Sequence, residues 1–278
     1  MSGDVDAAGG QAGSLARVSE LAGLFPDEDF RLQLTLRRGE PRAFFTAQDA
    51  SGRVRAERRR WIADTPGRYA VVRSEGEPMV REFAGWCREW GVSEANAVET
   101  LGGEVEPDFL VLSADAEGRF RLRGGALCFP TGWALEEKLG QTMEEIHGVV
   151  PALNSTIGGS IRQFMERMRP GMGFLRDNWG IAATDELNLH PARGLAGPTL
   201  PVELERLWLR VEHQMLARLP ESDGVLFGIR VRLHRLDAVK ADERTARGLA
   251  RALLTMSEQM AAYKRLERIR TELVRALA

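Results

Sequence analysis

The chain has very little cysteine and no long apolar run. Its 278 residues include only two cysteines, Cys87 and Cys128, and no apolar stretch of about 18 residues that would span a bilayer. Two thiols can form neither a four-thiolate zinc site nor an iron–sulfur cluster held by this chain alone. They fit a reduced, cytoplasmic compartment. Because a basic and apolar leader is also missing, we expect neither export nor a membrane anchor.

A large net charge of either sign is also missing. The 38 basic residues nearly balance the 40 acidic ones, so the molecule has no field that would recruit nucleic acid. An arginine-rich segment, residues 53–60, lies beside Trp61. It can be interpreted as a phosphate-contacting strip with a stacking aromatic, or as a strand edge protected by charge. The balanced composition favours the second interpretation.

The common nucleotide and hydrolase motifs are absent. The sequence has no GxxxxGK[ST], GxGxxG, HExxH, GxSxG or CxxCH, which are the usual signs of nucleotide binding, zinc proteolysis, serine hydrolysis and covalent haem. A redox activity in this chain would therefore need an electron supply from elsewhere.

Hydrophobic periodicity predicts an α+β fold. Residues 1–18 are rich in Gly, Ala and Asp and offer little to bury, which predicts a flexible leader before one domain over residues 19–278. Alternating apolar positions predict strands, and apolar positions at helical spacing predict helices. The predicted strands are 32–36, 109–112, 120–122 and 225–233, and the predicted helices are 78–90, 156–168, 201–219, 241–255 and 257–277.

Four histidines are candidates for acid–base or metal chemistry, and no two of them have ligand spacing. His147 stands out because the capping sequence Thr142–Glu145 starts a short helix that ends at this residue. An imidazole at a helix end can be a capping cation or an iron ligand, and the residues alone leave both readings open.

Several short motifs, in a fixed order, resemble the haem-dependent oxidative N-demethylase alpha-subunit family. The likeness extends over residues 25–265, and one position departs from the pattern, where His213 replaces an arginine of the family. The motifs are Cys128–Trp133, Lys138–Gly140, Ile146–His147 with Val150–Pro151, Arg176–Trp179, Glu212–Pro220, Phe227–Arg230 and Ala262–Lys264.

The resemblance implies a PAS-like antiparallel sheet with flanking helices and a helical C-terminal extension. It also implies non-covalent haem b with His147 as the iron ligand, and oxidation of a small methylated amine, such as dimethylamine, by dioxygen. By motif position, Arg176, Asn178, Trp179 and Arg230 are candidates for holding the haem propionates or lining the pocket.

In such a family the electrons come from NADPH through FMN and a 2Fe-2S centre on a partner reductase subunit, and a tetrahydrofolate-binding subunit receives the one-carbon product. The two cysteines and the missing nucleotide motifs agree with electron transfer from a partner. Two other hypotheses stay open: a non-catalytic haem sensor of oxygen or redox state, and a scaffold that binds no haem.

Overall fold

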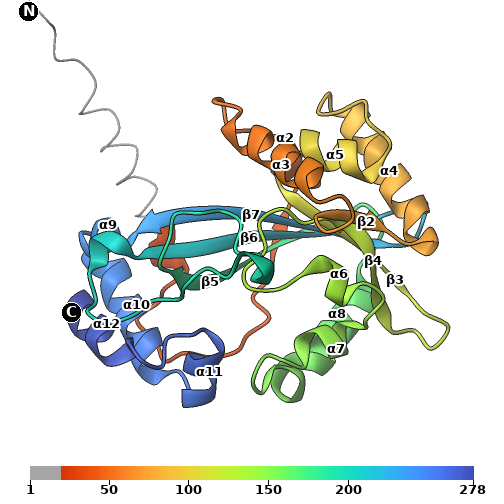
Figure 1. The fold of residues 1–278 in the computed structure, drawn as a ribbon. Coiled ribbons are helices and arrows are strands. Elements are labelled where there is room, and N and C mark those ends of the chain that lie inside the picture. The colour runs from red at the N-terminus through yellow and green to blue at the C-terminus, as the bar shows by residue number, and fades with distance from the viewer. Residues whose placement is uncertain (1–19) are drawn as a thin grey trace, which may run out of the picture.

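The computed structural model describes residues 20–278, so the leader predicted for residues 1–18 lies outside the described part of the chain. Seven strands form one antiparallel sheet in the order β1-β5-β6-β7-β3-β4-β2 (Figure 1). The strands are β1 Arg37–Gly39, β2 Ala70–Val72, β3 Asp108–Ala114, β4 Phe120–Ala126, β5 Gly173–Ala182, β6 Trp208–Arg218 and β7 Val225–Arg235. The predicted α+β class is confirmed, and the PAS-like relationship stays a prediction.

The predicted hairpin at 109–122 and the strand at 225–233 are confirmed. Asp115 stabilises the β3–β4 turn, because its carboxylate accepts the N–H groups of Glu117 at 3.1 Å and Arg119 at 2.9 Å. Gly118 has a φ of 77°, which favours glycine at this position. Strands β6 and β7 pair over their whole lengths and form the centre of the sheet.

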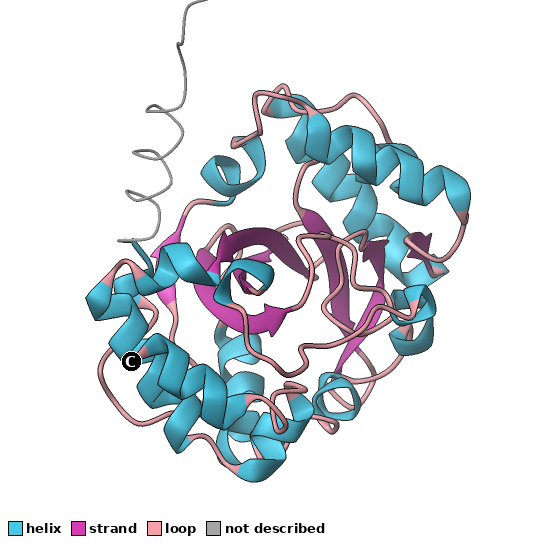
Figure 2. Ribbon diagram, turned by 60° about the vertical axis from the view of Figure 1, so that its left-hand side comes forward, coloured by secondary structure: helices cyan, strands magenta, loops and turns pink. Residues whose placement is uncertain are grey.

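Helices cover both faces of this sheet (Figures 1 and 2). The predicted helices at 78–90 and 156–168 are confirmed, whereas the one predicted at 257–277 is two shorter helices. The helices are α2 Pro41–Thr46, α3 Arg53–Asp64, α4 Glu77–Glu89, α5 Val98–Glu104, α6 Leu135–Lys138, α7 Met143–His147, α8 Gly159–Arg167, α9 Leu236–Lys240, α10 Glu243–Thr255, α11 Glu258–Tyr263 and α12 Arg270–Leu277. The π-helical turn Asn154–Gly158 precedes α8, and short 3-10 turns lie at Glu20–Gly23, Ser74–Gly76, Pro191–Arg193 and Leu204–Arg206.

Strand alternation gives the sheet two different faces. Helices α2 to α5 pack on one face around Phe45, Phe83 and Met215, and we call this the Phe45 face. Helices α7 and α8 pack on the other, where Leu216 of β6 lies in the same apolar cluster as Phe164 of α8. We call this the Leu216 face.

A third group of helices, α10 to α12, packs with the N-terminal segment around one end of β5 and β6. Its cluster contains Phe25, Leu209 and Val211, and Trp179 packs against it. Within residues 20–278, the structure has no helix with the length and apolar content to cross a bilayer.

Three of the predicted elements are wrong. The helix predicted at 201–219 is instead strand β6, Trp208–Arg218, preceded by the 3-10 turn Leu204–Arg206. Leu207, Leu209, Val211 and Met215 lie at alternate positions on one face, but both faces of β6 are buried, so the polar–apolar alternation that marks a strand is interrupted by buried polar groups. Residues 53–60 belong to helix α3 and not to a strand edge.

The strand predicted at 32–36 is also wrong. Only β1, Arg37–Gly39, forms just beyond it, where it pairs with the first residues of β5. The residues before it lack a neighbouring strand in the described structure, and apolar alternation without a partner does not give a ladder.

Candidate functional site

His147 lies at the C-terminal end of α7, as predicted. The helix begins with a capping box, in which Thr142 Oγ1 accepts Glu145 N–H at 3.2 Å and Thr142 N–H donates to the Glu145 carboxylate at 2.6 Å. This box fixes a helix of only five residues and so fixes the position of its last side chain.

The imidazole of His147 is half-buried and makes no hydrogen bond to any residue of the described chain. Burial, together with the nearby Arg176 cation, lowers the pKa of His147, while Glu144 acts in the opposite direction. The ring is therefore neutral near pH 7. A neutral imidazole nitrogen without a partner is the form that binds a metal.

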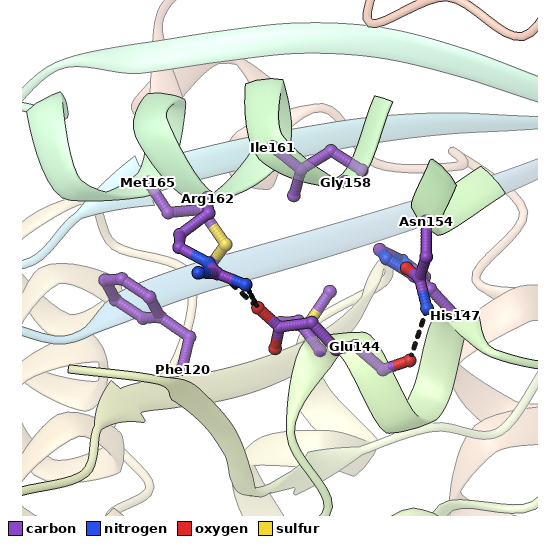
Figure 3. Close-up of a pocket in the computed structure, with 9 residues that line it drawn as sticks. Phe120, Glu144, His147, Asn154, Gly158, Ile161, Arg162 and Met165 are labelled. Atoms are coloured by element: carbon purple, nitrogen blue, oxygen red, sulfur yellow. Dashed lines mark hydrogen bonds and ion pairs between the residues drawn. The ribbon is translucent and has the colours of Figure 1, made fainter. Parts of the chain in front are cut away.

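A small pocket lies beside His147 (Figure 3). Asn154 lies next to His147 at one end and donates to the carbonyl of Glu144 at 2.8 Å, and Arg162 forms an ion pair with Glu144 at 2.9 Å. Phe120 and Met165 close the other end. The space inside is about 10 Å³, which is room for at most one water molecule. A larger ligand of His147 must lie outside this pocket.

Arg176 lies on the Leu216 face. In the β5–β6 register Arg176 pairs with Gln214, and Asn178 pairs with Glu212, so these four side chains share that face. Burial lowers the pKa of Arg176, and Glu212 and Asp177 partly offset this effect. Arg176 has no ion pair within 4 Å among residues 20–278. It is a largely buried cation available to an anionic group.

Glu212 is the carboxylate at the centre of this face. It is 7% exposed and accepts hydrogen bonds from the hydroxyl of Thr131 at 2.5 Å, Gln214 Nε2 at 2.9 Å and Asn178 Nδ2 at 3.3 Å. All three donors are neutral, and no cation of the described chain lies within 4 Å of the carboxylate. Its negative charge is therefore hydrogen-bonded but has no direct counter-ion.

Arg210 fixes the segment that carries Thr131. Its guanidinium is 1% exposed and donates to Thr131 Oγ1 at 2.8 Å and to the carbonyls of Phe129 at 2.7 Å and Leu187 at 2.8 Å. Burial lowers the pKa of Arg210 to about 10. These bonds anchor the 129–131 segment to β6.

A second, half-buried cation comes from the residue that follows α11. Lys264 Nζ donates to the carbonyl of Trp179 at 2.7 Å and lies 4.7 Å from the centre of the Trp179 ring. Burial lowers the pKa of Lys264 to about 8, and Glu212 has a weaker effect in the opposite direction. Like Arg176, Lys264 has no ion pair within 4 Å in residues 20–278.

Not all of the sequence-predicted residues come together. Arg176 lies near enough to His147 for its charge to lower the pKa of that imidazole, and Asn178 shares the face that carries Arg176. Trp179 pairs with Val211, so it lies on the other face of β5, where it packs against Lys264 and makes edge contacts with Phe25 and Phe30. Arg230 pairs in register with His213, so it lies on the opposite, Phe45 face. There it binds the carboxylate of Glu106 and the carbonyls of Phe44 and Ala47.

His213, where the sequence departs from the family pattern, also lies on the Phe45 face. Its Nδ1 is 2.7 Å from Asp177, which Arg37 also contacts at 2.7 Å. His213 therefore lies on the face opposite to the one that carries Arg176.

Sequence reasoning missed three members of the site. All three lie inside motifs that carried the family resemblance, Thr131 in Cys128–Trp133, Glu212 in Glu212–Pro220 and Lys264 in Ala262–Lys264. These motifs could have indicated the three residues from the sequence. They could not show that β6 is a strand, and it is this strand that places Glu212 next to Asn178.

The described residues have no group of three or more His, Cys, Asp or Glu side chains that could hold a metal ion. The site instead offers one histidine without a hydrogen-bond partner and two half-buried cations without an ion pair among residues 20–278. These groups define a class of site that fits an anionic metal cofactor bound through a single protein ligand, and haem with its two propionates has this chemistry.

The comparison with known families agrees with this class. Residues 82–274 match the family described as haem-dependent oxidative N-demethylase, alpha subunit-like. The chain belongs to this family. The matched range includes His147, Arg176, Glu212 and Lys264.

Proposed function

We propose that this protein is the haem-binding catalytic subunit of an oxidative N-demethylase that acts on a small secondary methylamine such as dimethylamine. The observation that carries the proposal is the ring of His147, which is half-buried, has no hydrogen-bond partner in the described chain and has a lowered pKa. Membership of the family supports the same function.

In this proposal His147 would bind the iron of non-covalent haem b, and Arg176 and Lys264 would bind its propionates. The unpaired state of both cations supports this assignment, because burying a cation without a counter-ion is unfavourable until an anion arrives. Bound haem would supply the activation of dioxygen. Arg230 lies on the opposite face of the sheet and binds Glu106, so this proposal gives it no role in the haem site.

Glu212 and Asn178 are proposed to orient the amine. A secondary amine is protonated near neutral pH and carries two N–H donors and two apolar methyl groups. Glu212 presents a buried carboxylate that only neutral groups contact. An ammonium donor would therefore gain a charge-assisted hydrogen bond there.

The overall reaction balances with partners that this chain does not contain. One oxygen atom of dioxygen ends in formaldehyde and the other in water, the methyl C–N bond breaks, and NADPH supplies two electrons. We propose that a reductase subunit with FMN and a 2Fe-2S centre delivers these electrons. A folate-binding subunit would then take up the formaldehyde.

Turnover with a reductase tests the enzymatic proposal. The haem-loaded full chain is mixed with an NADPH-dependent flavin and iron–sulfur reductase and dimethylamine, and formaldehyde and NADPH are measured. We expect formaldehyde in proportion to the NADPH consumed above a control without amine. Stoichiometric haem without formaldehyde under any reductase or methylamine would contradict the enzyme and favour the sensor.

Glu212→Gln is the matched variant for this assay. It keeps the side-chain shape and removes the charge, so haem content should stay at the wild-type value while the KM for the amine rises about tenfold or more. Equal KM values for the two proteins would remove Glu212 from the amine site.

A further inference from the structure

A second cavity lies away from the His147 pocket. Its volume is about 150 Å³, and it is lined by Val54 of α3, Glu106, Phe129, Leu187 and the β7 residues 229–233. The residues assigned above to haem and amine binding do not line it. Most of its walls are apolar, and all of its charge comes from Glu106, Arg230 and Arg232.

Glu106 and Arg230 are the two charged residues of this cavity whose hydrogen bonds are made within the protein. Glu106 is 3% exposed, and its two oxygens accept from Arg230 Nη1 and from the backbone N–H of Asp49. Arg230 Nη2 also donates to the carbonyls of Phe44 at 2.8 Å and Ala47 at 2.6 Å. This carboxylate and this cation compensate each other.

Arg232 is the charged residue of this cavity whose guanidinium lacks a close partner in the described chain. Its only ionic contact in the described chain is a long one, 3.9 Å from Nη1 to Glu106 Oε1, and it makes no hydrogen bond there. Its side chain is 39% exposed, so it can be approached from solvent. The nearby carboxylate of Asp49 is already bound by Ser51 through its hydroxyl and backbone N–H. The cavity lining therefore has a surplus of one positive charge.

We propose that this cavity binds a small organic carboxylate through Arg232. The guanidinium offers two parallel N–H donors that match a carboxylate. The volume matches a ligand of about six carbon atoms, since a cavity of this size can hold benzene. The apolar side chains of Val54, Leu187 and Leu233 suit the hydrocarbon part of such a ligand.

The cavity also borders the segment that supports the first site. Phe129 lines the cavity, while its carbonyl accepts from Arg210 at 2.7 Å and its N–H donates to Asp108 at 3.1 Å. Two residues later Thr131 binds Glu212. A ligand packed on Phe129 therefore stabilises the folded protein at a point shared by both sites.

Calorimetric titration of the full chain with matched neutral and anionic probes tests this proposal, and it needs no haem. Butyrate and benzoate are compared with butyramide and benzamide, which have the same shape without the charge, and with inorganic phosphate. We expect the two carboxylates to bind and their amides to bind at least about tenfold more weakly. Equal binding of acid and amide, tighter binding of phosphate, or no binding of either carboxylate would overturn the proposal.

Two variants and a control separate charge from shape. Arg232→Gln removes the carboxylate donor and should weaken benzoate binding at least about tenfold, and Val54→Phe should abolish it by filling the cavity without changing the charge. Arg235→Gln removes a cation from the same strand, where Arg235 pairs with Asp237 at 2.6 Å outside the cavity, and should bind like wild type. Unchanged affinity in Arg232→Gln, or an equal loss in Arg235→Gln, would exclude Arg232 as the carboxylate ligand.

Discussion

Half-buried and buried charges without an ion-pair partner are the main feature of this protein at the scale of single residues. Arg176, Lys264 and Glu212 each lose solvent, and none has an opposite charge within 4 Å in the described chain. A charge that has lost solvent and has no partner lowers the free energy of unfolding. These three groups are therefore better explained as binding groups than as parts of the scaffold.

Lys264 should make stability depend on pH. Its pKa in the folded state is about 8, below the unfolded value of about 10.4. Between these values the unfolded chain binds the extra proton, so the free energy of unfolding contributed by Lys264 rises as the pH increases from about 8 to about 10.4. Urea denaturation of wild type and Lys264→Met across this range measures the difference between them. A difference that is constant or falls with pH would contradict the lowered pKa.

Arg58 and Asp108 show the other way in which a charge is buried here. Both are essentially inaccessible and form an ion pair, and Asp108 also accepts the N–H groups of Cys128 and Phe129. Arg58→Met leaves the carboxylate buried without its cation and should lower the free energy of unfolding by about 3–5 kcal/mol. The control is Arg53→Met on the exposed start of the same helix, which should change it by less than about 0.5 kcal/mol. Similar effects for the two variants would show that the pair is not what stabilises this region.

At the scale of elements, hydrophobic periodicity correctly predicted the helices and strands that have one apolar and one polar side. The helix at α4 and the strand at β7 were correct because their apolar positions follow one period. Strand β6 was predicted wrongly because Arg210, Glu212 and Gln214 are buried on its second face. Both faces of the strand contact other parts of the protein, so its polar residues do not mark an exposed side. Helix α3 was misread because its buried cation is paired with Asp108, which no local pattern shows.

The same limit applies to the candidate site. His147 was predictable from the capping sequence and the family motifs, and the structure places it at the helix end. Arg230 was grouped with Arg176 because both lie in motifs, yet strand register puts them on opposite faces. A one-residue change of register reverses the face of every side chain, and a single sequence does not fix register.

The capping box of α7 is an element-scale feature that bears on the site. Thr142→Ala removes the hydroxyl that accepts Glu145 N–H and should cost about 1 kcal/mol in the free energy of unfolding. Because α7 has only five residues, its last residue should also be less well held. Haem affinity should therefore fall in Thr142→Ala and remain unchanged in Thr156→Ala, an exposed threonine of the π-helical turn. Wild-type haem affinity in Thr142→Ala would show that the cap does not position His147.

At the scale of the whole molecule, the N-terminal segment and the C-terminal helices form one packed unit with the end of the sheet. Phe25 is buried against Trp179, and Gly248 of α10 allows the Phe25 backbone to approach closely. Residues far apart in sequence therefore support the strand that carries Arg176. Whether residues 19–278 form a single folding unit stays a prediction.

Gly248→Ala tests this contact. A Cβ at this position would lie 2.0 Å from the Phe25 carbonyl oxygen, so the backbone must shift and the protein should be destabilised despite the higher helix propensity of alanine. Gly85→Ala in α4 meets no atom within 4 Å and should stabilise by about 0.5–1 kcal/mol. Denaturant unfolding of both variants gives the comparison. Stabilisation of both would show that the segment around Phe25 is not held against α10.

The central claim is that His147 holds haem, and a haem titration of the full chain tests it most directly. The absorption spectrum is recorded for wild type, His147→Ala and His213→Ala, the last being a histidine on the opposite face of the sheet. We predict one haem per wild-type chain with a Soret band that shifts when the reduced protein binds carbon monoxide, the same behaviour in His213→Ala, and loss of the band or of stoichiometric binding in His147→Ala. A wild-type Soret band and haem content in His147→Ala would contradict the account.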